Sequence, residues 1–217
     1  MRTILLGWLL VVGCGRDARM LDDAASSPRV ERARFERERR PDRIVQALAI
    51  RPGSKVADIG AGQGLYTEYL AEAVAPSGRV IATDIEKPVL DLLHDRLARA
   101  GLDEVVEERI VAPDSPGLER GSYELIVPDT DDPEWFTDPD ETASYDAILL
   151  ADVDHFLEDE AAWLAQARRA LAPEGRIVIA NRDVHHRRAL EAARAAGLRV
   201  ASDTPLAPGR YVAILTR

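Results

Sequence analysis

The chain has 217 residues, of which 46% are hydrophobic but only 5% aromatic, and this composition suits one domain with an aliphatic core. Its formal net charge of −10 would repel phosphate backbones, which argues against a nucleic acid partner. The single cysteine, Cys14, excludes both a disulfide within the chain and a cysteine-based zinc site.

Residues 1–14 have the pattern of a secretory signal. After Arg2, the apolar run Ile4–Val12 is roughly nine residues long, too short to span a bilayer, which takes about 20, but long enough for a signal-peptide core. Val11-Val12-Gly13-Cys14 resembles the lipobox of bacterial lipoproteins, in which the cysteine is acylated and becomes the mature N-terminus. The resemblance implies a lipid-anchored protein of the bacterial cell envelope. An aspartate directly after the cysteine favours retention in the inner membrane, so Gly15 at this position favours the outer membrane. If the stretch is instead an apolar strand with an incidental cysteine, the protein is cytoplasmic.

Two further segments precede the regular part of the chain. Residues 15–29 are rich in small and polar side chains, which is typical of a flexible tether. We therefore expect the folded domain to cover residues 30–217. Val30–Arg40 alternates arginine with glutamate and predicts a solvated helix, although Phe35 leaves open a clamp over a bound ligand.

From Pro41 onward the pattern alternates between strand and helix. The expected helices cover residues 41–49, 64–74, 88–100, 158–171 and 184–196. The expected strands cover residues 55–59, 79–83, 106–111, 145–150, 176–180, 198–201 and 211–215. This order predicts an α/β, Rossmann-like, doubly wound and mostly parallel seven-stranded sheet whose last strand is antiparallel. Ligands of such sheets bind at the carboxyl ends of the strands.

A glycine-rich turn follows the first of these strands. It reads Asp58-Ile59-Gly60-Ala61-Gly62-Gln63-Gly64, and such a turn lets backbone approach a ligand closely. A dinucleotide-binding G-x-G-x-x-G would need its third glycine one residue later, at Leu65. Asp58 would also repel a pyrophosphate and attract an ammonium group, so a nucleotide-binding Rossmann enzyme is the weaker alternative.

The turn resembles the first motif of Class I S-adenosylmethionine-dependent methyltransferases. The resemblance implies that Asp58 holds the methionine ammonium of the cofactor, directly or through water. It also implies that Gly60, Ala61, Gly62 and Gly64 cradle the methionine and ribose. The alternative is an ordinary glycine-rich turn.

Two more acids match the family's cofactor positions. Asp84 ends the second strand about 20 residues after the glycines, where the family places a carboxylate that accepts both ribose hydroxyls. Ile85 would pack on the adenine, and Glu86 is a weaker candidate for the ribose. Asp114 matches the acid that accepts from the adenine amino group, but an aspartate before Ser-Pro also suits a turn.

The strand that ends near Leu150 leads to the remaining candidates. Asp152 is expected at the cofactor, and His155 is the candidate general base, because its pKa suits proton removal at neutral pH. A capping or packing histidine is the alternative. Asp152 and Asn181 fall where some catechol-type members bind magnesium, and Asp183 with His185 and His186 could suggest a metal cluster. Ala180 replaces the second magnesium acid and a helix starts at this cluster, so we expect no metal.

The stretch from Ser122 to Ser144 is longer than the family needs and very acidic, which indicates a solvated loop or, through Trp135 and Phe136, a lid. The resemblance covers about residues 41–217 and implies an enzyme that uses S-adenosylmethionine to methylate an unidentified small molecule or protein. A lipoprotein that keeps this fold only as a binding module is the competing hypothesis.

Overall fold

The computed structural model describes residues 28–119, 123–125 and 144–217. It divides the chain into two units, one ending at Arg34 and one spanning Phe35–Arg217. Of the first unit it describes only residues 28–34, which are helical. The predicted signal peptide, Cys14 and most of the predicted tether therefore lie outside the described residues. The predicted tether is too long at its end, because helix α1 already begins at Pro28.

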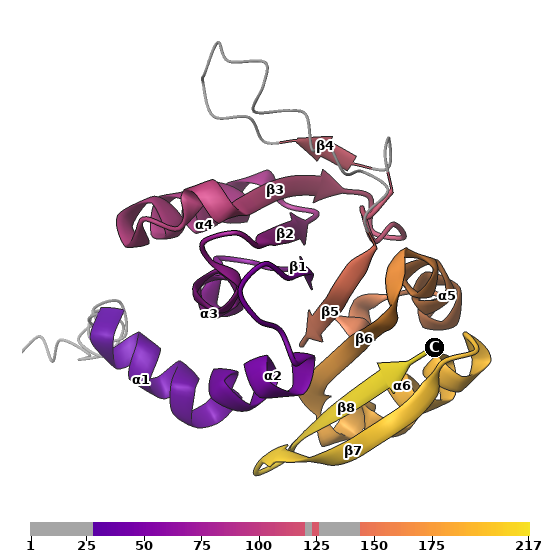
Figure 1. Cartoon of the computed structure of the whole chain (residues 1–217). Helices are drawn as coiled ribbons and strands as arrows, with labels where there is room; N and C mark the ends of the chain where they lie inside the picture. Colours follow the sequence, from indigo (N-terminus) through magenta and orange to yellow (C-terminus); the bar gives the residue numbers. More distant parts are fainter. Residues whose placement is uncertain (1–27, 120–122, 126–143) are drawn as a thin grey trace, which may run out of the picture. The chain divides into compact units, whose positions relative to one another are not determined.

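The second unit alternates strands with helices, as the sequence predicts (Figure 1). The α-helices are α1 (Pro28–Arg39), α2 (Pro41–Leu48), α3 (Leu65–Val74), α4 (Lys87–Ala100), α5 (Glu160–Ala170) and α6 (Asp183–Ala195). The strands are β1 (Lys55–Ile59), β2 (Arg79–Asp84), β3 (Val106–Val111), β4 (Tyr123–Leu125), β5 (Tyr145–Ala151), β6 (Leu171–Arg182), β7 (Arg199–Ala207) and β8 (Arg210–Thr216). Among the described helices, none is long and apolar enough to cross a membrane.

These strands form one sheet in the order β4-β3-β2-β1-β5-β6-β8-β7. The neighbouring pairs β3-β2, β2-β1, β1-β5 and β5-β6 are parallel, and β8 runs antiparallel to both β6 and β7. The predicted Rossmann-like sheet with an antiparallel last strand is thereby confirmed. It gains one strand beyond the predicted seven, since β4 adds to the edge at β3 in antiparallel orientation.

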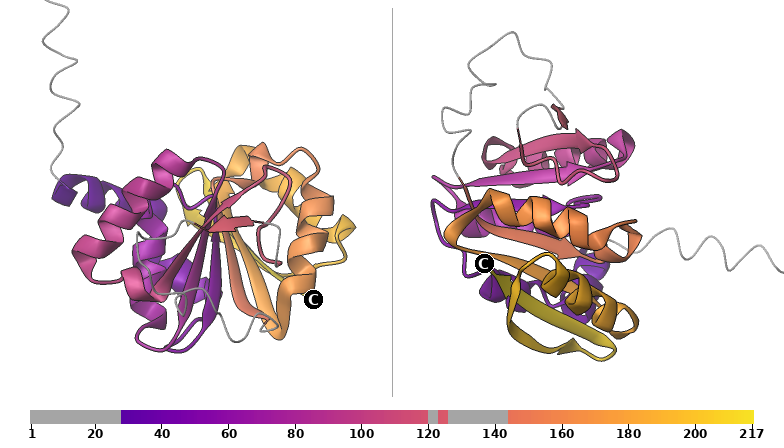
Figure 2. Two further views of the ribbon diagram at one scale, coloured as in Figure 1. Left: turned by 90° about the horizontal axis from the view of Figure 1, so that it is seen from above. Right: turned by 90° about the vertical axis from the view of Figure 1, so that its right-hand side faces the viewer.

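The central strands send alternate side chains into two cores. In β5, Ala147 and Leu149 belong to the core on one face, whereas Ile148 and Leu150 belong to the core on the other. Side chains alternate across a strand, and a parallel sheet is buried on both faces, so an unbroken apolar run is what such a strand requires. Figure 2 shows α3 and α4 on one side of the sheet and α5 and α6 on the other.

Helix ends are defined by local chemistry. Gly101 ends α4 with a φ of 67°, and the N–H of Leu102 donates to the carbonyl of Leu97 over 3.0 Å, as in a Schellman turn. Asp159 caps α5, because its Oδ1 accepts from the N–H of Ala162 over 2.9 Å.

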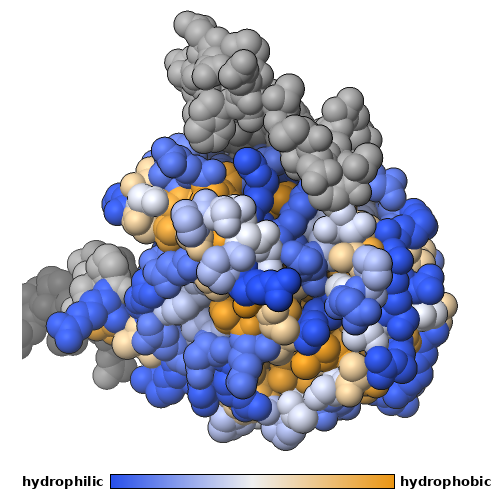
Figure 3. All heavy atoms as spheres, viewed as in Figure 1, coloured by the Kyte–Doolittle hydropathy of each residue, from blue (hydrophilic) through white to orange (hydrophobic). Residues whose placement is uncertain are grey.

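Hydrophilic residues cover much of the face in Figure 3, and apolar residues reach that surface in patches near its middle.

Strand β6 is longer than the sequence indicates. We expected this strand to begin at Arg176, but Leu171 already pairs with Tyr145, and a register shift separates this pair from the regular ladder. A Cβ on Gly175 would lie 2.6 Å from the carbonyl oxygen of Tyr145. The absent side chain of Gly175 is therefore what lets β6 approach β5 here.

Candidate active site

A cavity of about 480 Å³ lies at the carboxyl edge of the sheet, where β1, β2, β3 and β5 end. Its volume falls in the range of small-molecule sites, which is about 300–1,000 Å³. Five residues that the sequence singled out line it: Gly60, Asp84, Ile85, Glu86 and Asp152. The other lining residues are Ile59, Thr83, Val111, Ala112, Pro113, Ser115, Val153, Phe156, Leu157 and Trp163.

The glycines after β1 have positive φ angles that suit few other residues. Gly60 has a φ of 65°, and a Cβ on it would lie 2.6 Å from Val153 Cγ2. Gly64 has a φ of 79°, and its Cβ would lie 2.8 Å from Leu93 Cγ. Gly62, at 55°, would place a Cβ in open space. The packing of the loop thus requires glycine at positions 60 and 64, where a side chain would clash, whereas open space lies beside Gly62. Ala61, Gly62 and Gly64 do not line the cavity.

Asp58 lies in the core beneath this loop instead of lining the cavity. Its side chain is buried, and its Oδ2 accepts from Thr67 Oγ1 over 2.7 Å. Burial raises the pKa of Asp58 to about 7, and the nearby carboxylate of Asp84 adds to the rise.

Asp84 faces the cavity and is held by backbone. Its Oδ2 accepts from the N–H of Gly62 over 2.9 Å, and its Oδ1 accepts from the N–H of Glu86 over 3.1 Å. A carboxylate has about four acceptor positions, so both oxygens keep capacity for a ligand. Ile85 beside it is 54% exposed, a large fraction for an isoleucine, and provides an apolar surface at the cavity.

Asp114 is exposed and does not line this cavity. It lines an adjoining pocket with Pro113 and Phe156. The N–H of Ser115 donates to the carbonyl of Ala112 over 3.0 Å, so the segment is also a turn. Ser115, not Asp114, reaches the cavity.

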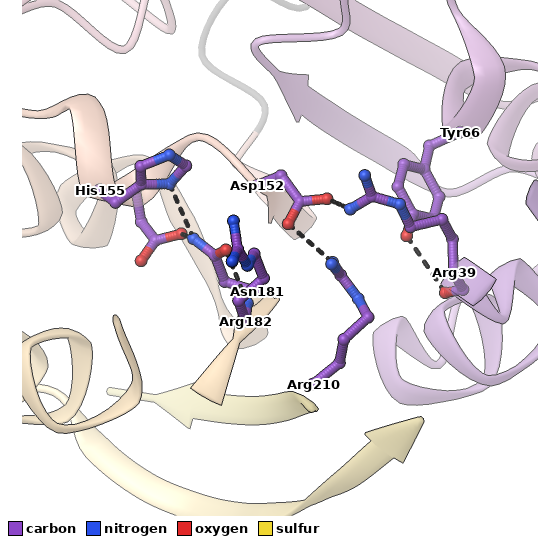
Figure 4. A network of polar contacts seen from close by, with 8 residues as sticks. Arg39, Tyr66, Asp152, His155, Asn181, Arg182 and Arg210 are labelled. Carbon is purple, nitrogen blue, oxygen red and sulfur yellow. Dashed lines mark hydrogen bonds and ion pairs between the residues drawn. The ribbon is translucent and has the colours of Figure 1, made fainter. Parts of the chain in front are cut away.

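Asp152 is held between two arginines that the sequence did not single out (Figure 4). Arg210 Nη2 donates to Asp152 Oδ1 over 2.7 Å, and Arg39 Nη1 forms an ion pair with Asp152 Oδ2. Asp152 has a φ of 58°, a left-handed conformation that is uncommon outside glycine. Arg39 belongs to the helix predicted to be solvated, and the hydroxyl of Tyr66 donates to its carbonyl over 3.2 Å.

His155 lies close to the cavity wall without lining it. Asn181 Nδ2 donates to Asp154 Oδ1 over 2.5 Å and lies 3.0 Å from His155 Nδ1, while Asn181 Oδ1 accepts from the N–H of Arg182 over 2.7 Å. The amide is thereby oriented with its donors toward His155, so the neutral imidazole carries its proton on Nε2. The ring also stacks on His185 with 4.2 Å between centroids, and burial lowers the pKa of His155. This geometry favours a hydrogen-bond donor over a base.

Behind His155 lies a buried acidic cluster. Asp154 and Glu160 are 1% and 4% exposed, and burial raises the pKa of both, that of Glu160 to about 7. Arg188 Nε lies 3.1 Å from Glu160 Oε2 and lessens that rise. Tyr211 lies near both acids, and burial raises its pKa as well.

The sequence raised Asp183, His185 and His186 as an alternative metal cluster, and such a group would lie in the part of the chain that the structure describes. There, no group of three or more His, Cys, Asp or Glu side chains is arranged to hold a metal ion. His185 stacks on His155, and His186 Nε2 lies 2.7 Å from Asp203 Oδ1.

The donor set fits S-adenosylmethionine. Asp84 offers free acceptor positions of a carboxylate, Ile85 an apolar surface, and the open side of Gly62 a place where backbone can approach a ligand. Asp152 supplies a second carboxylate on the same cavity.

Comparison with known proteins gives the family. A family profile described as a methyltransferase domain matches residues 57–177, more than half of the chain. The ubiquinone/menaquinone biosynthesis C-methyltransferase UbiE of Burkholderia cenocepacia is 32% identical over 130 residues, which are 60% of this chain and 44% of that protein. The protein-L-isoaspartate O-methyltransferase of Aeropyrum pernix is 40% identical over 76 residues, 35% of this chain and 29% of that protein. The matches thus span less than half the length of these curated relatives.

Solved structures share the fold. A S-adenosylmethionine-dependent methyltransferase from Aquifex aeolicus superposes with a TM-score of 0.66 at 18% identity, covering 92% of this chain and 97% of that one. A TehB-like methyltransferase from Corynebacterium glutamicum superposes with a TM-score of 0.57 at 20% identity, covering 92% and 93%. The chain belongs to the methyltransferase domain family, and it has the Rossmann-like fold of solved S-adenosylmethionine-dependent methyltransferases.

Proposed function

We propose that this protein transfers the methyl group of S-adenosylmethionine to a small-molecule or protein acceptor, and not to a nucleic acid. The observation that carries the proposal is the cavity that joins Gly60, Asp84, Ile85 and Asp152 at the carboxyl edge of the sheet. The formal charge of −10 supports the exclusion of nucleic acid.

The cofactor-binding roles are divided along this edge. Asp84, whose oxygens are fixed by the N–H groups of Gly62 and Glu86, would accept the ribose hydroxyls, and Ile85 would pack on the adenine. Asp152 would face the methionine end. Three further roles are proposed on the resemblance alone: Asp58 acting on the ammonium, Asp114 on the adenine amino group, and the loop of Gly60, Ala61, Gly62 and Gly64 as a cradle.

The bound cofactor supplies a methyl group that is already activated by its positive sulfur. The protein therefore has mainly to orient the acceptor and exclude water, a contribution that can be worth about 7–11 kcal/mol. The apolar walls formed by Val153, Leu157 and Trp163 suit water exclusion. His155 is the proposed group for the acceptor's proton. In the arrangement found here it would have to release Asn181 before Nδ1 could accept one.

Asp84→Ala tests the cofactor site. It should weaken S-adenosylmethionine binding by about 1.5–3 kcal/mol, the range for hydrogen bonds to a charged group. Isothermal titration of wild type, Asp84→Ala and the exposed control Asp95→Ala measures this, with thermal melting to verify folding. An affinity of Asp84→Ala equal to that of wild type would remove Asp84 from the site. Formation of S-adenosylhomocysteine with acceptor fractions then separates an enzyme from a binding module.

We also propose that residues 1–14 are a lipoprotein signal, that residue 15 begins a tether, and that acylated Cys14 anchors the domain in the bacterial cell envelope. Support comes from the short apolar run Ile4–Val12 and from the position of the chain's single cysteine directly after Val11-Val12-Gly13. An outer-membrane location is the proposed site within the envelope.

A further inference from the structure

The carboxyl edge of the sheet has two chemically different halves. The ends of β2 and β1 carry Asp84, Glu86 and the glycine loop, which form the proposed cofactor side. Beyond β5, Arg182 ends β6 and pairs in register with Arg210, the first residue of the antiparallel strand β8. Arg182 and Arg210 therefore stand side by side at this edge. If the cofactor occupies the cavity over β2, β1 and β5, this is the half of the edge that remains for an acceptor.

Asp152 lies at the boundary and shows how a carboxylate fits there. Its two oxygens each contact a different guanidinium, Oδ1 that of Arg210 and Oδ2 that of Arg39 (Figure 4). Arginine is suited to such pairing because its planar, permanently charged group matches a carboxylate. The backbone of Asp152 adopts a φ of 58° in this arrangement.

One carboxylate does not satisfy both guanidiniums. The side chain of Arg210 is only 10% exposed, and its Nε has no hydrogen-bond partner among the described residues. Burial and the mutual repulsion with Arg210 lower the pKa of Arg39, and burial lowers that of Arg210. Glu38 acts on both arginines in the opposite direction, as Asp183 does on Arg210. A buried cation without enough negative charge is costly unless a ligand supplies it.

We propose that Arg39 and Arg210 form a binding site for a carboxylate of the methyl acceptor, and that Asp152 occupies this site until the acceptor arrives. The acceptor is therefore a carboxylic acid, or a protein side chain next to one. This inference rests on the proposed function, since it takes the cavity over β2, β1 and β5 for the cofactor. Arg210 also lines a second cavity of about 480 Å³ with Asp183, His186 and Tyr211.

The probe is succinate, with its neutral diamide succinamide as the matched control ligand. Succinate is titrated calorimetrically into the full chain at low ionic strength, with and without saturating S-adenosylhomocysteine. S-adenosylhomocysteine carries its own homocysteine carboxylate, so it fills the cofactor site and leaves only an acceptor site for succinate. Failure of the wild type to bind S-adenosylhomocysteine would overturn the proposed function, whereas the succinate titration alone reports on the arginine pair.

Arg39→Gln and Arg210→Gln should each weaken succinate binding by about tenfold or more, because each removes charged hydrogen bonds. Arg99→Gln, an exposed arginine in the last turn of α4, should bind as wild type does. Asp152→Asn should act in the opposite direction and tighten succinate binding by about tenfold, since it frees a site that the chain itself occupies. A merely structural role of the ion pairs would not produce this gain.

Three results would overturn the proposal. Succinamide could bind as well as succinate, the Asp152→Asn variant could bind succinate no better than wild type, or S-adenosylhomocysteine could abolish succinate binding. The last result would give the arginine pair to the cofactor's own carboxylate. Thermal melting of each variant shows whether it is folded, and Arg39, whose side chain is 35% exposed, is the substitution that the fold tolerates better.

Discussion

Asp58 shows at the residue scale how burial changes the meaning of a motif. Asp58 stands two residues before Gly60, and the sequence motif predicts an ionic role for it toward the cofactor. The structure places its carboxyl in the core with Thr67, at a pKa of about 7, so near neutral pH it is partly protonated. Sequence spacing identifies such an acid, but its ionisation depends on packing that no spacing encodes.

This burial makes stability depend on pH. The folded pKa of Asp58, about 7, exceeds the ordinary value of 3.8, so between these values the unfolded chain loses a proton that the folded chain keeps. The free energy of unfolding therefore falls as pH rises from about 4 to about 7, by at most about 4 kcal/mol from this group.

Asp58→Asn, which mimics the protonated carboxyl, should remove that contribution. Urea denaturation should show the variant more stable than wild type at pH 8, and more stable by a much smaller margin at pH 5. The exposed control Asp95→Asn should show no such difference between the two pH values. A variant that is less stable than wild type at both would contradict the pKa argument.

At the element scale, the loop between β1 and α3 was predicted as a strand–turn–helix, and this is confirmed. What the motif does not reveal is which glycine the fold requires, because that depends on Val153 and Leu93, which are distant in sequence. The same limit applies to β6, where glycine is required at position 175 because a side chain there would clash with the carbonyl oxygen of Tyr145. Arg39 and Arg210 were missed for this reason too. Arg39 is one of several arginines in the run Val30–Arg40, and Arg210 is far from it in the sequence, so only the folded domain brings both to Asp152.

Alanine at two of these glycines should separate packing from backbone conformation. Gly60→Ala should lower the free energy of unfolding by about 2–4 kcal/mol, because it combines a left-handed φ with a clash against Val153. Gly62→Ala meets no atom within 4 Å and should lower it by about 1 kcal/mol, from the φ alone. Urea denaturation of both variants provides the comparison. Equal losses would mean that Val153 moves aside without cost.

At the scale of the whole molecule, the fold and the methyltransferase family could be predicted because alternation of strand and helix and one local motif suffice for them. The acceptor could not, since the side chains proposed to recognise it, Arg39 and Arg210, come from α1 and β8, which are distant in the sequence. The chain is also acidic overall while its acceptor half presents arginines. A small anion would meet local positive charge there, whereas a polyanion would meet the repulsion of the whole surface.

The final prediction concerns the anchor. The run Ile4–Val12 is far shorter than the about 20 residues that cross a bilayer, so attachment should depend on Cys14 rather than on this segment. One acyl chain binds a membrane only marginally, but a mature lipoprotein carries several, so the wild type should partition into detergent and membrane fractions. Cys14→Ser should be soluble or remain unprocessed, and mass spectrometry of the N-terminus distinguishes the two.

The same pair of proteins separates location from chemistry. Cys14 lies outside residues 57–177, which match the methyltransferase family, so Cys14→Ser should bind S-adenosylmethionine with wild-type affinity in titration. A wild type that stays in the cytosol and keeps Met1 would end the anchor hypothesis. Because S-adenosylmethionine is made in the cytosol, a cytosolic protein would have direct access to this cofactor. An anchored protein instead requires a route by which the cofactor reaches the envelope.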